Sequence, residues 1–261
     1  MPAESPDEKR KARGVPTRLL SILPEHSMGD FFIMLTKKQQ NSMRVKRITA
    51  IALFCALAYV CMLYIKIPVQ FLTLDVKDSL IVLCSLIFGP VAGLVIAVTV
   101  PFLELITISG TGIYGFIMNV LSSVVFSLTA GLIYRYRKTL AGAVASLVAA
   151  VFSVTAVMVL ANLLITPYYL GASPEDVAAI IPTLLLPFNL IKATLNAAIV
   201  LLLYKPLSKI LKRFGFLQSS APAGEEATGT ARNPLRSSLV TLVAVLIIAA
   251  SLCVIFLVLK K

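Results

Sequence analysis

Long apolar runs alternate with short polar segments along the whole chain. The apolar runs lie at about 48–65, 79–109, 112–134, 140–167, 180–203 and 237–259. A helix needs about 20 residues to cross the hydrocarbon of a bilayer, and these runs are too long and too continuous for the alternating strands of a membrane barrel. The pattern therefore predicts an all-α integral membrane protein.

The run at 79–109 is too long for one span and contains Gly89-Pro90, a pair that commonly turns a chain. With a turn there, 78–88 becomes a helix of about half the bilayer thickness, and six helices precede residue 214. Broken membrane helices are tolerated where protein or a water-filled cavity covers the exposed backbone groups. We therefore expect a cavity in the outer half of this region.

Composition agrees with a membrane protein, and charge predicts its orientation. Hydrophobic residues make up 58% of the chain, and the formal net charge is +12. With a turn at Gly89-Pro90, the basic tail 1–47, Arg135 to Lys138, Lys205 to Arg213 and Arg232 with Arg236 share one face. By the positive-inside rule this face is cytoplasmic. Because the charges lie beside apolar spans without interleaved aromatics, we expect contact with anionic lipid and no nucleic-acid binding.

The same patterns divide the chain into four segments. A basic cytoplasmic tail (1–47), without the apolar core of a secretory signal, precedes a six-helix membrane domain (48–213). Residues 214–236 are rich in Ala, Gly, Ser, Thr and Glu and predict a flexible cytoplasmic linker. Residues 237–261 contain a seventh transmembrane helix, which is uniformly apolar and is interpreted as an anchor.

Lys192 lies inside an apolar span, where an ionised lysine costs several kcal/mol unless it is paired. One interpretation is a structural ion pair with Glu104. The other is a ligand site, because Asn189 lies one turn away on the same helix face and Asn162 precedes the Thr166-Pro167 break of another helix. Two amides and a lysine suit a neutral heterocycle with imide and carbonyl edges.

Other polar and small residues have simpler interpretations. Asn119, Ser122 and Ser123 are expected to form interhelical hydrogen bonds, and Asn196 could do the same. Ala52 and Ala56 form a small-residue strip that lets another helix approach, either within the bundle or from a partner. The four cysteines are expected to be inert core residues. The sequence has no phosphate-binding loop or H-E-x-x-H motif, so any energy source must lie elsewhere.

Five stretches resemble, in the same order, the riboflavin-specific substrate-binding (S) component of energy-coupling factor (ECF) transporters. They are FLTLDVKD (71–78), LIFGPVAGL (86–94), ITISGTGIYGFIMNVLSS (106–123), NLLITPYYLG (162–171) and LPFNLIKATLNAAIVLLLYKP (186–206). The resemblance covers about residues 45–213. It implies a six-helix S-component bundle in the bacterial cell membrane that captures riboflavin from outside and uses no cofactor. A transmembrane coupling protein and two cytoplasmic ATPase subunits would complete the transporter.

The resemblance also implies roles for particular residues. Asn189 and Lys192 form the N-x-x-K motif that holds the isoalloxazine ring together with Asn162. Further substrate-binding positions are implied on the long loop after the first helix and near the end of the third: Leu74, Asp75 and Thr107. Ala52 and Ala56 stand at the positions that dock on the coupling protein. The resemblance leaves open whether flavin mononucleotide is also accepted. The long basic tail and the seventh helix depart from the family's usual pattern.

Two other functions fit parts of the pattern. One is an intramembrane enzyme acting on a lipid or prenyl substrate, with Lys192 and Glu104 as an acid-base pair, although no second catalytic group or metal site is evident in the sequence. The other is a structural membrane subunit whose polar residues only pack helices. A flavin bound to the purified protein would separate both from the transporter.

Overall fold

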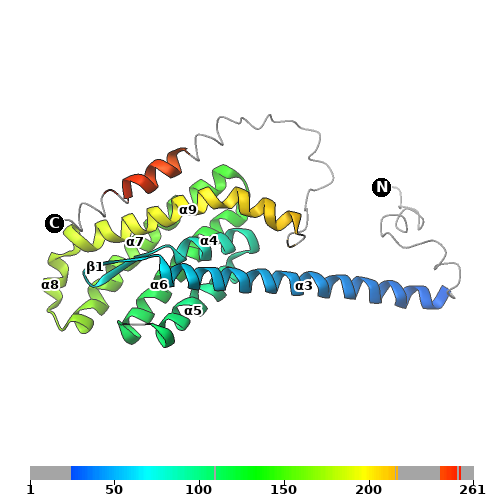
Figure 1. Cartoon of the computed structure of the whole chain (residues 1–261), viewed down its shortest axis with the longest axis horizontal. Helices are drawn as coiled ribbons and strands as arrows, with labels where there is room; N and C mark the ends of the chain where they lie inside the picture. Colours follow the sequence, from blue (N-terminus) through cyan, green and yellow to red (C-terminus); the bar gives the residue numbers. More distant parts are fainter. Residues whose placement is uncertain (1–24, 109, 215, 217–241, 252, 254–261) are drawn as a thin grey trace. The chain divides into compact units, whose positions relative to one another are not determined.

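The computed structural model describes residues 25–108, 110–214, 216, 242–251 and 253. The chain divides into two units, 1–46 and 47–261. Besides a short helix at Leu242–Ser251, the elements are those labelled in Figure 1: α3 (Glu25–Tyr64), β1 (Lys66–Val69), β2 (Leu72–Asp75), α4 (Lys77–Phe88), α5 (Pro90–Thr107), α6 (Gly112–Tyr136), α7 (Leu140–Leu170), α8 (Pro174–Ala179), the π-helix η1 (Ile181–Leu185) and α9 (Leu186–Arg213).

The helices confirm the predicted membrane bundle. Among the described residues, five segments are long and apolar enough to cross a bilayer: Gln40–Tyr64, Pro90–Thr107, Gly112–Tyr136, Leu140–Leu170 and Ile181–Leu211. The sixth element, α4, has only 12 residues. At 1.5 Å per residue it is roughly 18 Å long, a little over half of the hydrocarbon thickness. The expected half-length helix is therefore present.

The break between α4 and α5 falls at the predicted pair. Gly89 has φ of 100°, a conformation that favours glycine, and Pro90 is the first residue of α5. The turn packs closely on α6, because a Cβ at Gly131 would overlap Ser85 Oγ. Ser85 Oγ donates to the Ser127 carbonyl at 2.8 Å. The short helix is thus held against α6 by both close packing and a hydrogen bond.

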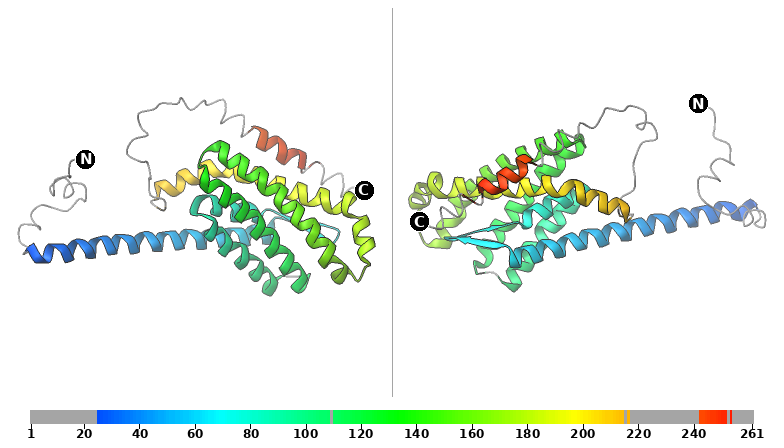
Figure 2. Two further views of the ribbon diagram at one scale, coloured as in Figure 1. Left: turned by 180° about the vertical axis from the view of Figure 1, so that it is seen from behind. Right: turned by 45° about the horizontal axis from the view of Figure 1, so that its top comes forward.

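A hairpin that the sequence analysis did not predict occupies the loop after the first helix. Strands β1 and β2 pair antiparallel, with Lys66 opposite Asp75 and Val69 opposite Leu72. Figure 2 shows the hairpin beside α9, to which side-chain hydrogen bonds join it. The two-residue turn is Gln70-Phe71, and Gln70 has φ of 54°. Such turns usually carry Gly or Asn, so the residues at this turn do not predict a hairpin.

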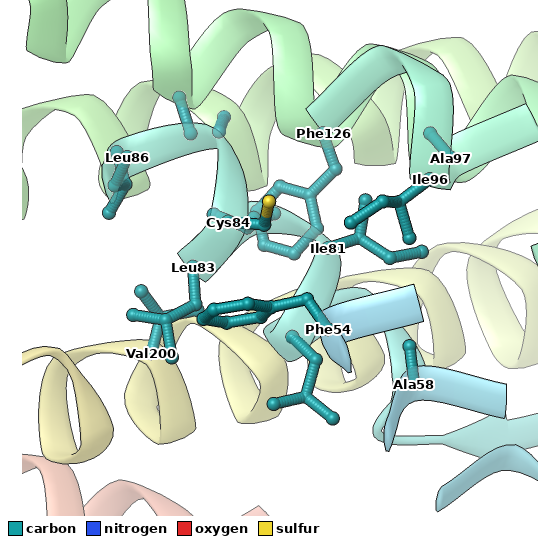
Figure 3. Close-up of a cluster of buried hydrophobic side chains, with 14 of the residues drawn as sticks. Phe54, Ala58, Ile81, Leu83, Cys84, Leu86, Ile96, Ala97, Phe126 and Val200 are labelled. Atoms are coloured by element: carbon teal, nitrogen blue, oxygen red, sulfur yellow. The ribbon is translucent and has the colours of Figure 1, made fainter. Parts of the chain in front are cut away.

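The apolar core of the bundle joins residues from six helices, α3, α4, α5, α6, α7 and α9. Phe54 of α3, Leu83 and Cys84 of α4, Phe126 of α6 and Val200 of α9 are all buried and lie together in Figure 3. Of the four cysteines, Cys84 is buried, Cys55 and Cys61 are partly buried, and Cys253 is exposed. The expectation that all four are core residues was therefore too broad.

Several boundaries differ from the predicted ones. Helix α3 begins at Glu25, so residues 25–47 of the predicted tail are helical. Helix α9 is preceded by the π-turn η1, in which the Leu185 N–H donates to the Ile180 carbonyl. We attribute this irregularity to Pro187, which has no N–H to donate. Residues 1–24 of the tail, nearly all of the linker 214–236, and both ends of the seventh helix lie outside the described residues.

Candidate binding cavity

A cavity of about 120 Å³ lies between the hairpin and four helices. Helix α6 contributes Tyr114, Met118 and Ser122, which are spaced four residues apart and therefore share one helix face. The remaining lining side chains come from the hairpin, from another position on α6 and from the facing sides of α5, α7 and α9. They include Phe71, Thr73, Asp75, Glu104, Asn119, Met158, Asn162, Thr166, Tyr169, Phe188, Asn189 and Lys192.

The structure brings together four of the six residues that the resemblance assigned to the substrate. Asn162, Asn189, Lys192 and Asp75 all line this cavity. Leu74 points away from it and packs with Val69, Phe188 and Leu195 in a small apolar cluster. Thr107 also lies outside the lining, where its Oγ1 donates to the Leu103 carbonyl and accepts from the Tyr59 hydroxyl at 2.9 Å.

Lys192 has a structural partner, but it is not the one expected. Its Nζ lies 2.8 Å from Asp75 Oδ2 and 3.2 Å from the Thr73 carbonyl oxygen. The proposed ion pair with Glu104 is therefore wrong. Asp75 was not predictable as the partner, because it lies in the loop after the first helix and only the hairpin fold brings it to the depth of Lys192.

Glu104 is paired with a different lysine. Lys77 Nζ, on the first turn of α4, lies 2.8 Å from Glu104 Oε2, and Asn119 Nδ2 donates to the same oxygen at 3.0 Å. Asn119 thus makes the expected interhelical bond and also borders the cavity. The two ion pairs balance the charges of Asp75 and Glu104. A cavity wall without net charge from these pairs suits an uncharged ligand.

The carboxyl group of Asp75 is buried at the cavity and lies close to two lysines, Lys192 and Lys77. Burial alone would raise the pKa of its carboxyl, but the charges of Lys192 and Lys77 outweigh burial and lower the pKa below its usual value. Asp75 is therefore a carboxylate at neutral pH. Its Oδ2 is bound to Lys192, whereas its Oδ1 is buried with no hydrogen-bond partner among the described residues. Such an oxygen is costly to leave unpaired, and a ligand donor would satisfy it.

Two of the three cavity asparagines, Asn162 and Asn189, are positioned by bonds to their own helices. Asn162 Nδ2 donates to the Met158 carbonyl at 2.7 Å, and its Oδ1 accepts from Thr166 Oγ1 at 3.0 Å. Asn189 Nδ2 donates to the Leu185 carbonyl at 2.8 Å. Each amide has further hydrogen-bonding capacity beyond these contacts, since an amide group carries two donor hydrogens and two acceptor lone pairs.

Two further buried polar groups have structural roles behind the cavity. Asn196 donates to the Asp75 carbonyl at 3.0 Å and accepts from the Ser79 N–H at 2.8 Å. It thereby fixes the start of α4 and the end of the hairpin to α9. Ser123 Oγ donates to Asp78 Oδ1 at 2.5 Å, which is an interhelical bond of the kind predicted. Neither Asn196 nor Ser123 lines the cavity.

An aromatic pair that was not predicted from the sequence also borders the cavity. Tyr114 of α6 and Tyr169 of α7 both line the cavity, with ring centroids 6.4 Å apart and planes inclined by 56°. Tyrosine offers a flat apolar face with a polar tip. The signal for Tyr169 was its spacing of seven residues from Asn162, which places both residues on nearly the same face of α7.

The small-residue strip on the first helix faces outward. Ala52 and Ala56 are both exposed, whereas Ala58 is buried. The exposed Leu53 and Leu57 have the same four-residue spacing on the adjacent side of the helix. The internal-packing interpretation does not fit Ala52 and Ala56, because no other described element covers them.

Comparison with known proteins is consistent across sequence and structure. The family described as "ECF transporter, substrate-specific component" matches residues 46–204, a range that contains every residue lining the cavity. The riboflavin transporter RibU of Staphylococcus aureus (strain TCH60) is 30% identical over 187 residues, which cover 68% of this chain and 98% of the relative. A solved structure described as "Structure and mechanism of the S component of a bacterial ECF transporter" matches with a TM-score of 0.56 and 31% identity, covering 65% of this chain and 99% of that one.

Proposed function

This chain belongs to the substrate-specific components of ECF transporters, and we propose that its substrate is riboflavin, captured from outside the cell. Members of this family are membrane transporter subunits and not enzymes, so the intramembrane-enzyme alternative is set aside. The observation that carries the riboflavin assignment is the convergence of Asn162, Asn189, Lys192 and Asp75 on one cavity without net charge from its ion pairs.

The chemistry of these four side chains matches that of a flavin. The isoalloxazine ring of riboflavin presents carbonyl oxygens and ring nitrogens as acceptors and one imide N–H as a donor, and the ribityl chain adds hydroxyl groups. Lys192 and the amides of Asn162 and Asn189 can donate to the acceptors. The unpartnered Asp75 Oδ1 can accept from the imide or from a hydroxyl. The hydrogen-bond acceptors of the flavin then meet donors of the protein, and its imide N–H or a ribityl hydroxyl meets an acceptor.

The rest of the cavity suits a flat aromatic ring. Tyr114, Tyr169, Phe188 and Met158 supply apolar surface on three different helices. Aromatic rings stack with an offset or meet edge to face, and sulfur also makes favourable contacts with ring edges. We place the isoalloxazine among these side chains, with its polar edge toward α9.

Riboflavin requires the cavity to widen. Ligand pockets usually measure roughly 300–1,000 Å³, whereas this cavity measures about 120 Å³. The hairpin borders the cavity as a two-stranded unit and is joined to α9 by the side chains of Lys192 and Asn196. We infer that the hairpin acts as the lid and shifts when the ligand enters.

Transport by this subunit requires partners. We propose that a transmembrane coupling protein docks on Ala52 and Ala56, and that two cytoplasmic ATPase subunits supply the energy. We also propose that the N-terminus is cytoplasmic, because the positive-inside rule places the basic tail and basic loops inside the cell. The cavity then lies at the outer face of the membrane.

The absorption spectrum of the full chain, purified without added ligand, tests the substrate. We expect the visible absorption bands of an oxidised flavin, which denaturation of the protein should release. A ligand-free protein that shows no spectral or thermal response to added riboflavin would contradict the assignment while leaving the family membership intact.

A further inference from the structure

A second cavity lies at the other end of the bundle. On α6, Tyr114 to Ser122 border the first cavity, whereas Gly131 to Arg135 border the second. The second cavity measures about 300 Å³ and forms where α4 ends and α5 begins. No role proposed above for riboflavin capture uses this cavity, and of its residues only the basic ones were expected to contact anionic lipid.

The lining of this cavity is strongly basic. It includes Arg47, Arg135 and Lys138, which come from α3, from the last turn of α6 and from the segment after it, and no acidic residue is among the described residues that line it. Arg47 Nη2 donates to the Phe88 carbonyl at 2.6 Å, which fixes its guanidinium at the cavity. A guanidinium has five N–H donors, so others remain for a ligand. Neither Arg135 nor Lys138 forms a salt bridge with another described residue.

The backbone adds to the positive potential. Helix α5 has 18 residues and begins at this cavity with Gly89 as its N-cap. The N-terminus of a helix carries partial positive charge, which favours an anion. Pro90 has no N–H and the Ala92 N–H donates to the Gly89 carbonyl, so this contribution comes from the helix dipole and the Val91 N–H. Three cationic side chains and a helix N-terminus thus converge on one cavity of sufficient size for a phosphate group.

Two exposed apolar side chains belong to residues that line the basic cavity or directly follow a lining residue. Val91, which itself lines the cavity, is 70% exposed, and Ile48, the residue after Arg47, is 66% exposed. In a membrane protein such side chains meet lipid tails. A dissolved phosphate would use only the basic groups, whereas a phospholipid would use both the basic groups and these apolar side chains.

We propose that the basic cavity binds the phosphate headgroup of an anionic phospholipid, with the acyl chains lying along Val91 and Ile48. This site is independent of riboflavin capture, because none of its lining residues borders the first cavity. A bound lipid would bridge α3, the α4–α5 turn and α6, and would therefore stabilise the bundle by mass action.

The test compares lipid binding to the full chain and to two double variants. Arg135→Gln with Lys138→Gln removes two cavity charges. Lys209→Gln with Arg213→Gln removes two exposed charges from α9 that do not line the cavity, so the net charge change is matched. Each protein is titrated in detergent micelles with phosphatidylglycerol, with phosphatidylcholine and with inorganic phosphate. Lipid-bound species are counted by native mass spectrometry, and thermal stability is followed in parallel.

We expect phosphatidylglycerol to bind and to raise the melting temperature of the full chain more than phosphatidylcholine does. The cavity variant should lose roughly tenfold or more in phosphatidylglycerol affinity, and the α9 variant much less. Equal losses in both variants would overturn the proposal, because the attraction would then be general. A full effect of inorganic phosphate alone would overturn the lipid assignment. Unchanged lipid binding with lost association of the coupling protein would show that the basic residues contact protein instead.

Discussion

Lys192 on α9 and Asp75 at the end of β2 form an ion pair across the wall of the candidate binding cavity, with 2.8 Å between Nζ and Oδ2. The two residues are far apart in sequence, and the pair joins the hairpin to the helix that carries the N-x-x-K motif. A structural role and a ligand role for Lys192 are therefore not alternatives, and an experiment must separate them.

Two variants achieve that separation. Lys192→Met alone removes the ligand donor and also leaves Asp75 with only the more distant Lys77, at 3.7 Å. We expect both weaker riboflavin binding and a lower melting temperature, because a buried charge that loses its partner is costly. Adding Asp75→Asn should restore much of the stability but not the affinity, which stays about five- to 150-fold weaker. Wild-type affinity in the double variant, measured by flavin fluorescence, would show that the pair is only structural.

Asn189 and Asn196 provide a matched comparison on one helix. Asn189 lines the cavity, whereas Asn196 bonds to the backbone of Asp75 and Ser79 behind it. Asn189→Leu should weaken riboflavin binding by about 1–3 kcal/mol with little change in stability. Asn196→Leu should lower the melting temperature, because it strands a buried N–H and a buried carbonyl. The opposite result, with affinity lost only in the Asn196 variant, would move the ligand away from the cavity.

The exposed alanine strip predicts a transport defect without a binding defect. Ala52→Trp or Ala56→Trp should stop riboflavin uptake in cells while leaving riboflavin binding in detergent unchanged, because bulk on this face blocks the approach of another helix. Leu57→Trp is the control, since Leu57 is exposed and already large. Normal uptake by both alanine variants would remove Ala52 and Ala56 from the proposed docking surface.

The hairpin is expected to respond to the ligand. Amide hydrogen exchange in residues 66–75 should slow when riboflavin binds, because the ligand contacts this lid and orders it. Slower exchange at α6 and α7 with no change in the hairpin would contradict its role as a lid.

Flavin mononucleotide should bind more weakly than riboflavin, because Lys192 and Lys77 near the cavity are already paired with carboxylates. Its phosphate would therefore find no available cation among the described lining residues.

Low pH should weaken the ion pair between Lys192 and Asp75. The pKa of Asp75 is lowered in the folded protein, so the pair contributes stability above the unfolded value of about 3.9 and loses it as the pH falls through the lower folded value. The contribution of this pair to the melting temperature should therefore be constant between about pH 5 and pH 8. Below about pH 4 the Asp75→Asn variant should lose less stability than the unchanged chain. Equal acid sensitivity of the two proteins would show that Asp75 is not the group responsible.

The fold was largely predictable, because long apolar runs mark the membrane helices and helix-breaking pairs such as Gly89-Pro90 mark where they end. Lys192, Asn189 and Asn162 stood out for the same reason, since polar groups in such runs need an explanation. The partner of Lys192 could not be predicted, because it depends on a hairpin whose turn at Gln70 lacks the usual residues. Leu74 shows the same limit, as the alternation of side chains along β2 turns Leu74 away from the cavity and Asp75 toward it.

The most direct test of the central claim is a titration of the purified full chain with riboflavin, followed by quenching of flavin fluorescence. The account predicts saturable quenching that ends at one riboflavin per chain, and about five- to 150-fold weaker binding for the Lys192→Met, Asp75→Asn double variant. Quenching that does not saturate at micromolar protein, or that is the same in the double variant, would contradict the claim that this cavity holds riboflavin.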